Sequence, residues 1–426
     1  MPLVRLGFLN KRDNVQRARL TTVLQCDNVR HHNNTGREQP INTTGRTKYY
    51  ASLDIWRGLA ALWVVMIHAS PAVSPFLSLG NKSMYNQPLY KFADWGRLGV
   101  VMFFVISGYC ISASAVSSLK HKDVARRYFT ARIRRIYPPY LASVVFAASL
   151  DLLWHVMAHR HGLHSMNHTL DLRRQPPLFY LATASLSQLL LRVPLLQDVY
   201  WTLNYEVAFY VIVGIVLWLV RAKTAASVLL ILNCFTTISL MVLCVRQGRI
   251  PFPLDLWYQF GLGVALYSII SEPKMKYLTC SNVSVFAMTM VYAYIYQGGY
   301  RMGLPSSRVD ACFAIAFTLL LLILHRHDSY LAKAPWSRGL RLLGMFSYSL
   351  YLTHHAVITI PAHTMALLGF SGSLYWVSFI VQISVSVVVG YAFYRLVEQP
   401  YLNRRANMTV VRVRVQENTS TPINSP

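Results

Sequence analysis

The sequence predicts an all-α fold, a polytopic membrane helix bundle, and three observations predict it. Hydrophobic residues make up 54% of the 426 residues and charged residues only 13%, whereas a soluble domain has about 25% charged residues. Apolar runs long enough to cross a bilayer, about 17–25 residues, recur along the chain. Lys and Arg gather in the short loops between these runs, which is the pattern that sets membrane orientation. The net charge of +25 therefore indicates membrane topology rather than nucleic-acid binding.

About ten of these runs are predicted to be transmembrane helices. In chain order they cover residues 53–73, 98–118, 136–158, 203–220, 224–245, 253–271, 283–299, 309–325, 342–368 and 374–396. A further apolar segment, 178–196, is interrupted near its end by Arg192 and Pro194. We expect this segment to be re-entrant or peripheral, because the distribution of basic residues disfavours an eleventh crossing.

The orientation follows from the Lys and Arg residues between the spans. With ten crossings and a cytoplasmic N-terminus, the cytoplasmic pieces carry 29 basic residues and the outer pieces 11. Positive charge accumulates on the cytoplasmic side of membrane proteins, and a crossing by 178–196 would reverse every later loop and remove most of this bias. Both termini are therefore predicted to be cytoplasmic.

The composition divides the chain into three parts. Residues 1–50 are rich in Asn, Arg and Thr and lack apolar periodicity, so we expect a disordered basic tail there. Residues 51–402 form the predicted membrane domain, and residues 403–426 a second polar tail.

One apolar run, LDIWRGLAALWVVMIHAS, contains both Arg57 and His68. Titratable groups inside a membrane are costly and mark functional sites. The eleven-residue spacing returns to the same helix face and separates the two side chains by about 16 Å along the helix. The predicted orientation puts Arg57 near the cytoplasmic face and His68 in the outer half. The alternatives are an arginine that extends to the interface and a histidine that only bonds a neighbouring helix.

A second titratable group, Glu206 in WTLNYEVAFY, is predicted at a depth similar to that of His68. A carboxylate that accepts a hydrogen bond from an imidazole fixes its tautomer and raises its basicity. The sequence therefore predicts that Glu206 orients His68, although capping of a helix end is an alternative for Glu206.

The basic segment ARRYFTARIRRIYPPY, residues 125–140, precedes the third predicted span. Arg132 and Arg135 offer guanidinium groups for an anionic ligand such as a phosphate, while orientation in the membrane and contact with anionic lipid are the alternatives. Pro138 and Pro139 fit the first turn of a helix, where a missing N–H is tolerated.

Small residues lie in the middle of the second span. In FFVISGYCIS, Ser107 and Gly108 are predicted to let a neighbouring helix approach closely.

Six of these segments together resemble the acyltransferase-3 family of integral membrane acyltransferases. They occur in the family's order and cover about residues 52–402: LDIWRGLAALWVVMIH, FFVISGYCIS, RRIYPPY, WTLNYEVAFY, SYSLYLTHH and VEQPY. The WTLNYE segment is most similar to bacterial exopolysaccharide and lipochitooligosaccharide O-acetyltransferases.

The resemblance implies a function and a set of site residues. It implies transfer of an acetyl or other short acyl group from cytoplasmic acyl-CoA, such as acetyl-CoA, to a carbohydrate hydroxyl. The acceptor would be a surface polysaccharide, a lipid-linked oligosaccharide or a lipochitooligosaccharide. The resemblance also implies a multi-pass protein of the bacterial inner membrane, in contact with membrane lipid. It assigns catalysis to Arg57, His68 and Glu206, donor binding to Arg57, Arg132, Arg135 and Tyr140, and substrate contacts to Tyr205, Ser349, Tyr351 and His354.

We expect no metal ion and no permanently bound cofactor, since acyl-CoA is a substrate. The oligomeric state is left open. A different class of function also fits titratable groups inside a membrane, namely a proton-coupled transporter or flippase of a glycan or lipid-linked precursor. Against it, the sequence has no clear inverted repeat of the kind many transporters contain.

Overall fold

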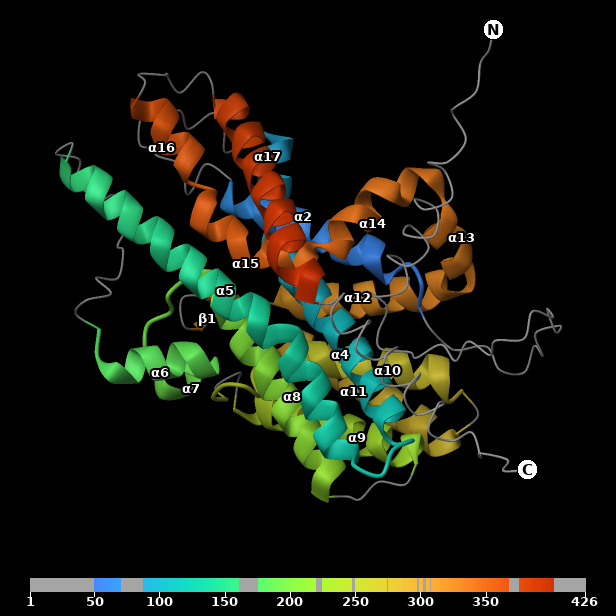
Figure 1. Cartoon of the computed structure of the whole chain (residues 1–426). Helices are drawn as coiled ribbons and strands as arrows, with labels where there is room; N and C mark the ends of the chain where they lie inside the picture. The colour runs from blue at the N-terminus through green and yellow to red at the C-terminus, as the bar shows by residue number, and fades with distance from the viewer. Residues whose placement is uncertain are drawn as a thin grey trace, which may run out of the picture.

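The computed structural model describes the membrane domain as a bundle of helices that cross at varied angles (Figure 1). The residues that it describes are 50–69, 87–160, 175–219, 224–246, 250–273, 275–296, 299–301, 304–306, 308–367 and 375–401. Of the predicted tails, 1–50 and 403–426, every residue except Tyr50 lies outside the described residues.

The first half of the chain contains eight of the described helices. They are α2 (Leu53–His68), α3 (Pro88–Asp94), α4 (Leu98–Ser118), α5 (Val124–Arg160), α6 (Pro177–Ser185), α7 (Gln188–Leu191), α8 (Trp201–Leu219) and α9 (Ala225–Val245). Two 3₁₀ turns, Trp95–Arg97 and Asp198–Tyr200, lead into α4 and α8.

The second half completes the bundle. Its helices are α10 (Trp257–Ser271), α11 (Lys276–Ile295), α12 (Arg308–Leu324), α13 (Asp328–Lys333), α14 (Arg338–Met345), α15 (Ser347–Val357), α16 (Ile360–Leu367) and α17 (Tyr375–Phe393), which continues into a π-helical turn, Tyr394–Glu398. The short strands β1 (Gly299–Arg301) and β2 (Leu304–Ser306) pair antiparallel between α11 and α12, with Tyr300 opposite Pro305.

Seven helical segments in the described part of the chain are long and apolar enough to cross a membrane. The all-α membrane fold is therefore confirmed, while the count of about ten spans is not. The predicted spans 53–73 and 253–271 correspond to α2 and α10, which have 16 and 15 residues, fewer than the roughly 20 that a membrane-crossing helix needs. The predicted span 342–368 is divided among α14, α15 and α16.

Helix α5 begins earlier than the sequence predicts. Pro138 and Pro139 were expected in a first turn, but they lie inside a helix of 37 residues. Prolines within membrane helices are tolerated because neighbouring helices and side chains contact the backbone near the break. Here the Tyr348 hydroxyl of α15 donates to the α5 carbonyl of Ile136, at 3.0 Å.

The segment 178–196 contains only short helices. Leu186 ends α6 and Arg192 ends α7 in left-handed backbone conformations, with φ of 54° and 55°. Helices of nine and four residues are too short to cross a bilayer, which needs about 20 residues. The description of this segment as re-entrant or peripheral agrees with these lengths.

Glycines allow the central helices to touch backbone to backbone. A Cβ added at Gly108 of α4 would lie 2.0 Å from the carbonyl oxygen of Phe260 in α10, and one at Gly58 of α2 would lie 2.1 Å from that of Leu340 in α14. The close helix approach predicted for Gly108 is confirmed, and it is the way that membrane helices associate through small residues.

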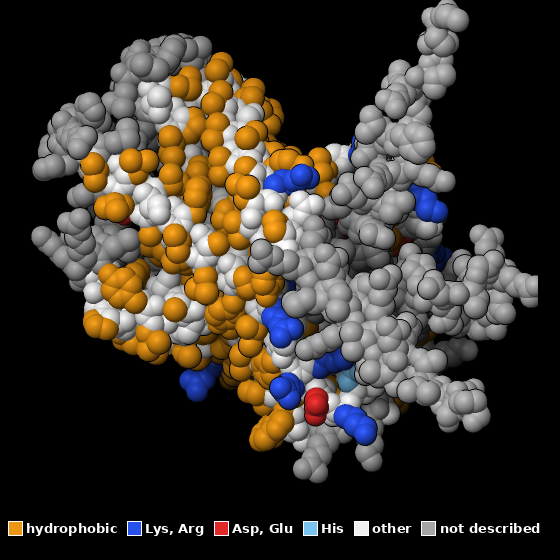
Figure 2. All heavy atoms as spheres, viewed as in Figure 1, with side chains coloured by type: hydrophobic (Ala, Val, Ile, Leu, Met, Phe, Trp, Pro, Cys, Tyr) orange, Lys and Arg blue, Asp and Glu red, His pale blue; other side chains and the backbone are white. Residues whose placement is uncertain are grey.

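The outside of the bundle is apolar. Figure 2 shows hydrophobic side chains over much of the described surface on this face, with Lys and Arg concentrated toward its lower edge. Large apolar side chains such as Val245, Tyr294 and Leu396 are about four-fifths exposed, at 82%, 82% and 78%. Such surfaces are stable against lipid chains, so the protein is a multi-pass membrane protein.

Candidate functional site

A cavity that opens in part to the outside lies among α2, α4, α5, α8 and the start of α15. Its lining divides into a polar part and an apolar part. The polar part is Arg57, Ser107, Arg135, Thr202, Glu206, Ser347 and Tyr348, and the apolar part is Val100, Phe103, Phe104, Ile136, Leu203 and Tyr351.

Two arginines from different helices define the charged side of the cavity. Arg57 comes from the second turn of α2 and Arg135 from the middle of α5. Both interact electrostatically with Asp54 and with Glu398 of the π-helical turn, and Arg57 lies 3.8 Å from the Asp54 carboxylate. These carboxylates hold two guanidinium groups at one cavity, an arrangement suited to an anionic ligand.

Glu206 of α8 lies on the same cavity, but it is not paired with the predicted imidazole. Its carboxylate accepts a short hydrogen bond from Tyr210 and a longer one, 3.4 Å, from Ser107. Among the described residues no hydrogen bond joins Glu206 to His68. The predicted orienting contact is therefore not formed, because Glu206 points toward α4 and along its own helix.

Arg132 does not line the cavity but contacts Tyr210, the hydrogen-bond partner of Glu206. Its guanidinium lies 5.5 Å from the centre of the Tyr210 ring and donates to the carbonyl of Cys110, at 3.3 Å. Arg132 is only 8% exposed, so it acts on the cavity through Tyr210 and Glu206.

The apolar wall of the cavity is held in place by aromatic packing. Phe104 stacks on Phe260 with ring centroids 4.4 Å apart, and Phe260 stacks in turn on Phe209 at 4.6 Å. The Tyr351 hydroxyl lies 2.7 Å from that of Thr202 and donates to the carbonyl of Val199, at 3.0 Å. Stacked rings and a tyrosine anchored at its hydroxyl leave this wall little freedom to move.

His68 lies next to this cavity, in a cluster of three imidazoles. Its ring centroid is 5.1 Å from that of His354 and 5.3 Å from that of His355. Tyr351 joins the cluster to the cavity, because its ring contacts His354 at 5.6 Å and the cavity residue Phe103 at 5.9 Å. His68 is not a lining residue of the cavity.

The tautomer of His68 follows from its contacts. Its Nδ1 atom lies 2.8 Å from the carbonyl oxygen of Val64. A carbonyl can only accept, so Nδ1 carries the proton and Nε2 keeps a lone pair, the form that a general base requires. Asp198 is the carboxylate that interacts electrostatically with His68.

Three other predicted site residues anchor helices and do not line the cavity. The Tyr140 hydroxyl donates to the carbonyl of Thr183, at 2.7 Å, and that of Tyr205 to the Asp255 carboxylate, at 2.9 Å. Ser349 donates to Glu398, at 2.5 Å. Tyr351, by contrast, lines the cavity as a substrate contact would.

Four residues of this region were not predicted as site residues. Tyr348 and Thr202 line the cavity, and His355 and Asp198 lie at the imidazole cluster. The sequence showed His355 next to His354 in SYSLYLTHH without indicating a role for it. Asp198 could not be found this way, because it precedes α8 in a turn whose position depends on tertiary packing.

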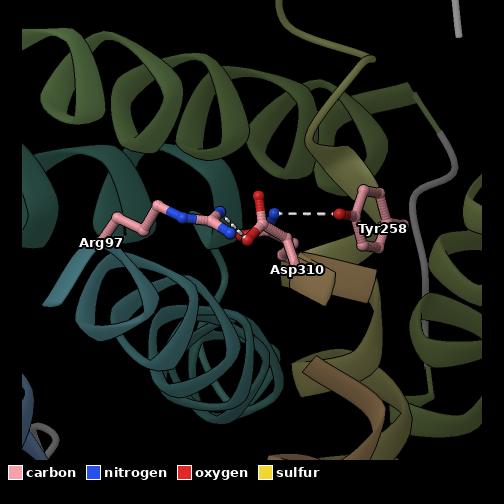
Figure 3. Close-up of polar contacts among 4 residues, drawn as sticks. Arg97, Tyr258 and Asp310 are labelled. Carbon is pink, nitrogen blue, oxygen red and sulfur yellow. Dashed lines mark hydrogen bonds and ion pairs between the residues drawn. The ribbon is translucent and has the colours of Figure 1, made fainter. Parts of the chain in front are cut away.

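A partly buried ion pair lies elsewhere in the bundle. Figure 3 shows Arg97, before α4, facing Asp310 in the first turn of α12, with Tyr258 of α10 on the far side of the carboxylate. The Tyr258 hydroxyl accepts a hydrogen bond from Gln259 Nε2, at 3.1 Å. This pair ties α4 to α12 and lies apart from the cavity.

The comparisons with known proteins agree with this architecture. The family model described as an acyltransferase domain matches residues 50–395. The chain is 22% identical to the O-acetyl transferase of Shigella phage Sf6, over 82% of this chain and 96% of that protein. It is 21% identical to the peptidoglycan O-acetyltransferase OatA of Listeria monocytogenes, over 83% of this chain and 56% of that protein. It is 22% identical to the O-acetyltransferase OatA of Staphylococcus aureus, over 83% of this chain and 57% of that protein.

Several of these relatives are longer proteins, and the chain spans about half of their length. No solved structure matches the chain. The fold and the site define a multi-pass membrane protein with a cationic cavity beside an imidazole cluster. The match over residues 50–395 shows that the chain belongs to the acyltransferase-3 family, and that this region is an acyltransferase domain.

Proposed function

We propose that the protein transfers an acetyl or other short acyl group from cytoplasmic acyl-CoA to a hydroxyl of a carbohydrate. The observation that supports this most strongly is the cavity on which Arg57, Arg135 and an apolar wall meet, beside His68, in a chain of an acyltransferase family. The names of the relatives, O-acetyltransferases and a peptidoglycan O-acetyltransferase, support a carbohydrate acceptor.

The donor is assigned to the cavity. Arg57 and Arg135 carry the charge that phosphate groups of CoA need, and Phe103, Phe104 and Leu203 offer a surface for the acyl end. Arg57 and His68 are separated by about 16 Å along α2. In acyl-CoA the extended pantetheine arm separates the phosphates from the thioester. This separation fits a site in which Arg57 binds the phosphates and His68 lies near the thioester.

His68 is the proposed general base. Its Nε2 lone pair takes the proton of the acceptor hydroxyl while the hydroxyl oxygen attacks the thioester carbonyl carbon. The C–S bond then breaks, the ester forms, and the CoA thiolate takes the proton from His68. General-base catalysis contributes about 10²–10⁴ in rate, and holding both substrates in one place supplies much of the remainder.

An acyl-histidine relay is the variant of this mechanism, in which His68 carries the acyl group between two half-reactions. Quenched-flow measurements separate the two forms. The relay produces a burst of CoA without acceptor, and direct transfer produces none.

Glu206 belongs to the donor cavity in this proposal. It accepts from Tyr210 and Ser107 and so orders the wall between α4 and α8. This role replaces the predicted contact with His68.

The proposed location is the bacterial inner membrane, with both termini in the cytoplasm and Arg57 on the cytoplasmic side. The bias of 29 to 11 basic residues supports this orientation. Cysteine labelling of single-cysteine variants from each side of the membrane tests it.

Purified protein in detergent or liposomes, with labelled acetyl-CoA, tests the activity. The candidate acceptors are peptidoglycan fragments, chitooligosaccharides and glucans. The proposal predicts release of CoA that depends on an acceptor, together with labelled ester on that acceptor. Movement of a glycan across liposomes without any ester formation would favour the transporter alternative and contradict the proposal.

A further inference from the structure

The three imidazoles around His68 form one group with a common hydrogen-bond pattern. His68 ends α2, whereas His354 and His355 are neighbours in α15. The ring centroids of His354 and His355 are 6.4 Å apart, and each lies a little over 5 Å from His68, at 5.1 and 5.3 Å. Two helices far apart in the sequence thus bring three bases to one point.

Each ring has its Nδ1 atom engaged. His68 Nδ1 donates to the carbonyl of Val64, at 2.8 Å, and His354 Nδ1 to the carbonyls of Leu350 and Tyr351, at 3.1 and 2.9 Å. His355 Nδ1 lies 2.7 Å from Gln197 Oε1, the acceptor atom of that amide. A neutral imidazole has one donor and one acceptor, so all three Nε2 atoms are acceptors.

The Nε2 atom of His354 has no partner. His354 is completely buried, and this atom makes no hydrogen bond in the described structure. A buried acceptor without a donor is unfavourable, and such atoms call for an explanation. An acceptor atom requires a hydrogen-bond donor as its partner, and a bound ligand can supply one.

The position of His354 identifies the ligand. The His354 ring lies 5.1 Å from the His68 ring, so a molecule that bonds His354 Nε2 also lies beside His68. Tyr351 contacts both His354 and the donor cavity. Neutral imidazole acceptors suit an uncharged donor such as a hydroxyl. Two acceptors on rings whose centroids lie 5.1 Å apart are close enough to bond two hydroxyl groups of a single sugar.

We propose that His354 binds a second hydroxyl of the acceptor sugar, beside the hydroxyl that His68 deprotonates. The inference rests on the proposed function and deepens it. The acceptor is then a sugar with two free hydroxyls close together, and His354 is the residue that selects for the second one. A site built to bond a hydroxyl rejects an analogue that lacks it, because its own polar atom is left unpaired.

The experiment combines sugar analogues with substitutions of His354. The probes are methyl β-D-glucopyranoside and its monodeoxy analogues, with acetyl-CoA as donor and the full chain as enzyme. His354→Asn keeps an N–H near the position of Nδ1 and removes the Nε2 acceptor, while His354→Gln returns an acceptor near Nε2. His327→Asn, an exposed histidine of the turn after α12, is the matched control.

With the wild-type protein, one deoxy analogue next to the acetylated position is expected to lose about tenfold or more in kcat/KM, mostly through KM. With His354→Asn, kcat/KM for the parent glycoside is expected to fall to the value that the wild type has for the deoxy analogue. The variant's kcat/KM for the analogue is expected to be equal to its value for the glycoside. His354→Gln restores part of the discrimination, and His327→Asn leaves it unchanged. A purely structural His354 predicts, instead, that His354→Asn keeps the wild-type ratio between glycoside and analogue.

Two outcomes separate the inference from the proposed function. If the wild-type protein acetylates the parent glycoside and every analogue that retains the reacting hydroxyl at equal rates, the inference about His354 is overturned and the proposed function is not. The absence of acetyl transfer to the glycoside and to every carbohydrate acceptor of the wider panel contradicts the proposed function itself.

Discussion

Arg57 in α2 and Glu206 in α8 line the same cavity, although the membrane helices α4 and α5 lie between them in the sequence. The finding puts a fixed cation and a carboxylate on one donor site, whereas the carboxylate was expected beside the imidazole. The mechanism changes accordingly, because His68 relies on Val64 and on other imidazoles rather than on Glu206.

Substitution of Arg57 tests the donor site. Arg57→Gln removes the charge, and Arg57→Lys removes the planar fork that binds phosphate through two bonds. Charge-assisted hydrogen bonds contribute about 1.5–3 kcal/mol, so KM for acyl-CoA is expected to rise about 10- to 100-fold. Steady-state kinetics with acetyl-CoA as the varied substrate measure this.

Arg134→Gln is the matched control for Arg57 and Arg135. Arg134 lies beside Arg135 on α5, is exposed, and does not line the cavity. We expect its KM to equal that of the wild type. A similar rise in KM for Arg134→Gln, or no rise for Arg57→Gln and Arg135→Gln, would place the donor elsewhere.

The pair of Glu206 and Tyr210 is expected to act as a unit. Glu206→Ala leaves the buried Tyr210 hydroxyl without its acceptor, which costs about 1–3 kcal/mol of folding stability. The double variant Glu206→Ala/Tyr210→Phe removes both groups and is expected to lose less than the sum of the single variants. Thermal unfolding in detergent measures the three proteins, and strict additivity would show that the two side chains do not interact.

The contact between α4 and α10 is predicted to depend on Gly108. Gly108→Leu places a side chain where the backbone of Phe260 lies, and overpacking of this kind typically costs about 1–3 kcal/mol. Gly339→Ala is the control, because nothing lies within 4 Å of an added Cβ there. Equal melting temperatures for both variants in a detergent thermal-shift assay would contradict the packing described for these helices.

Tyr140 and Tyr205 are predicted to support the fold and not to touch the donor. Tyr140→Phe and Tyr205→Phe each remove one hydrogen bond that joins elements, to Thr183 and to Asp255. The loss is expected to be about 1 kcal/mol of stability, with KM for acyl-CoA unchanged. A rise in KM for acyl-CoA with an unaltered melting temperature would contradict this prediction and would indicate that these residues bind the donor.

The sequence was sufficient for the membrane class and for part of the cavity. Arg57 and Glu206 stand out because charges in apolar runs are rare, whereas Arg135 belongs to the basic segment 125–140. All three line the cavity. Helix periodicity assigns each residue to a face of its own helix, but it does not say which helix packs against that face. The partners of Glu206 and His68 could therefore not be derived.

Two other features are determined by contacts between helices, which the sequence of a single segment does not reveal. Pro138 and Pro139 predict a helix start from local rules, yet α5 continues through them. Tyr140 and Tyr205 lie in segments that match the family, but their hydroxyl groups bond Thr183 and Asp255 on other segments. In each case the deciding contact comes from a neighbouring part of the fold.

The most direct test of the account is acceptor-dependent acetyl transfer by purified His68→Asn protein. Asparagine can retain the hydrogen bond to the carbonyl of Val64 while it lacks the basic Nε2 atom. The account predicts that acetyl-CoA binding and the melting temperature stay close to wild type, and that transfer falls by about 10²-fold or more. Transfer at the wild-type rate in this variant would contradict the assignment of His68 as the base.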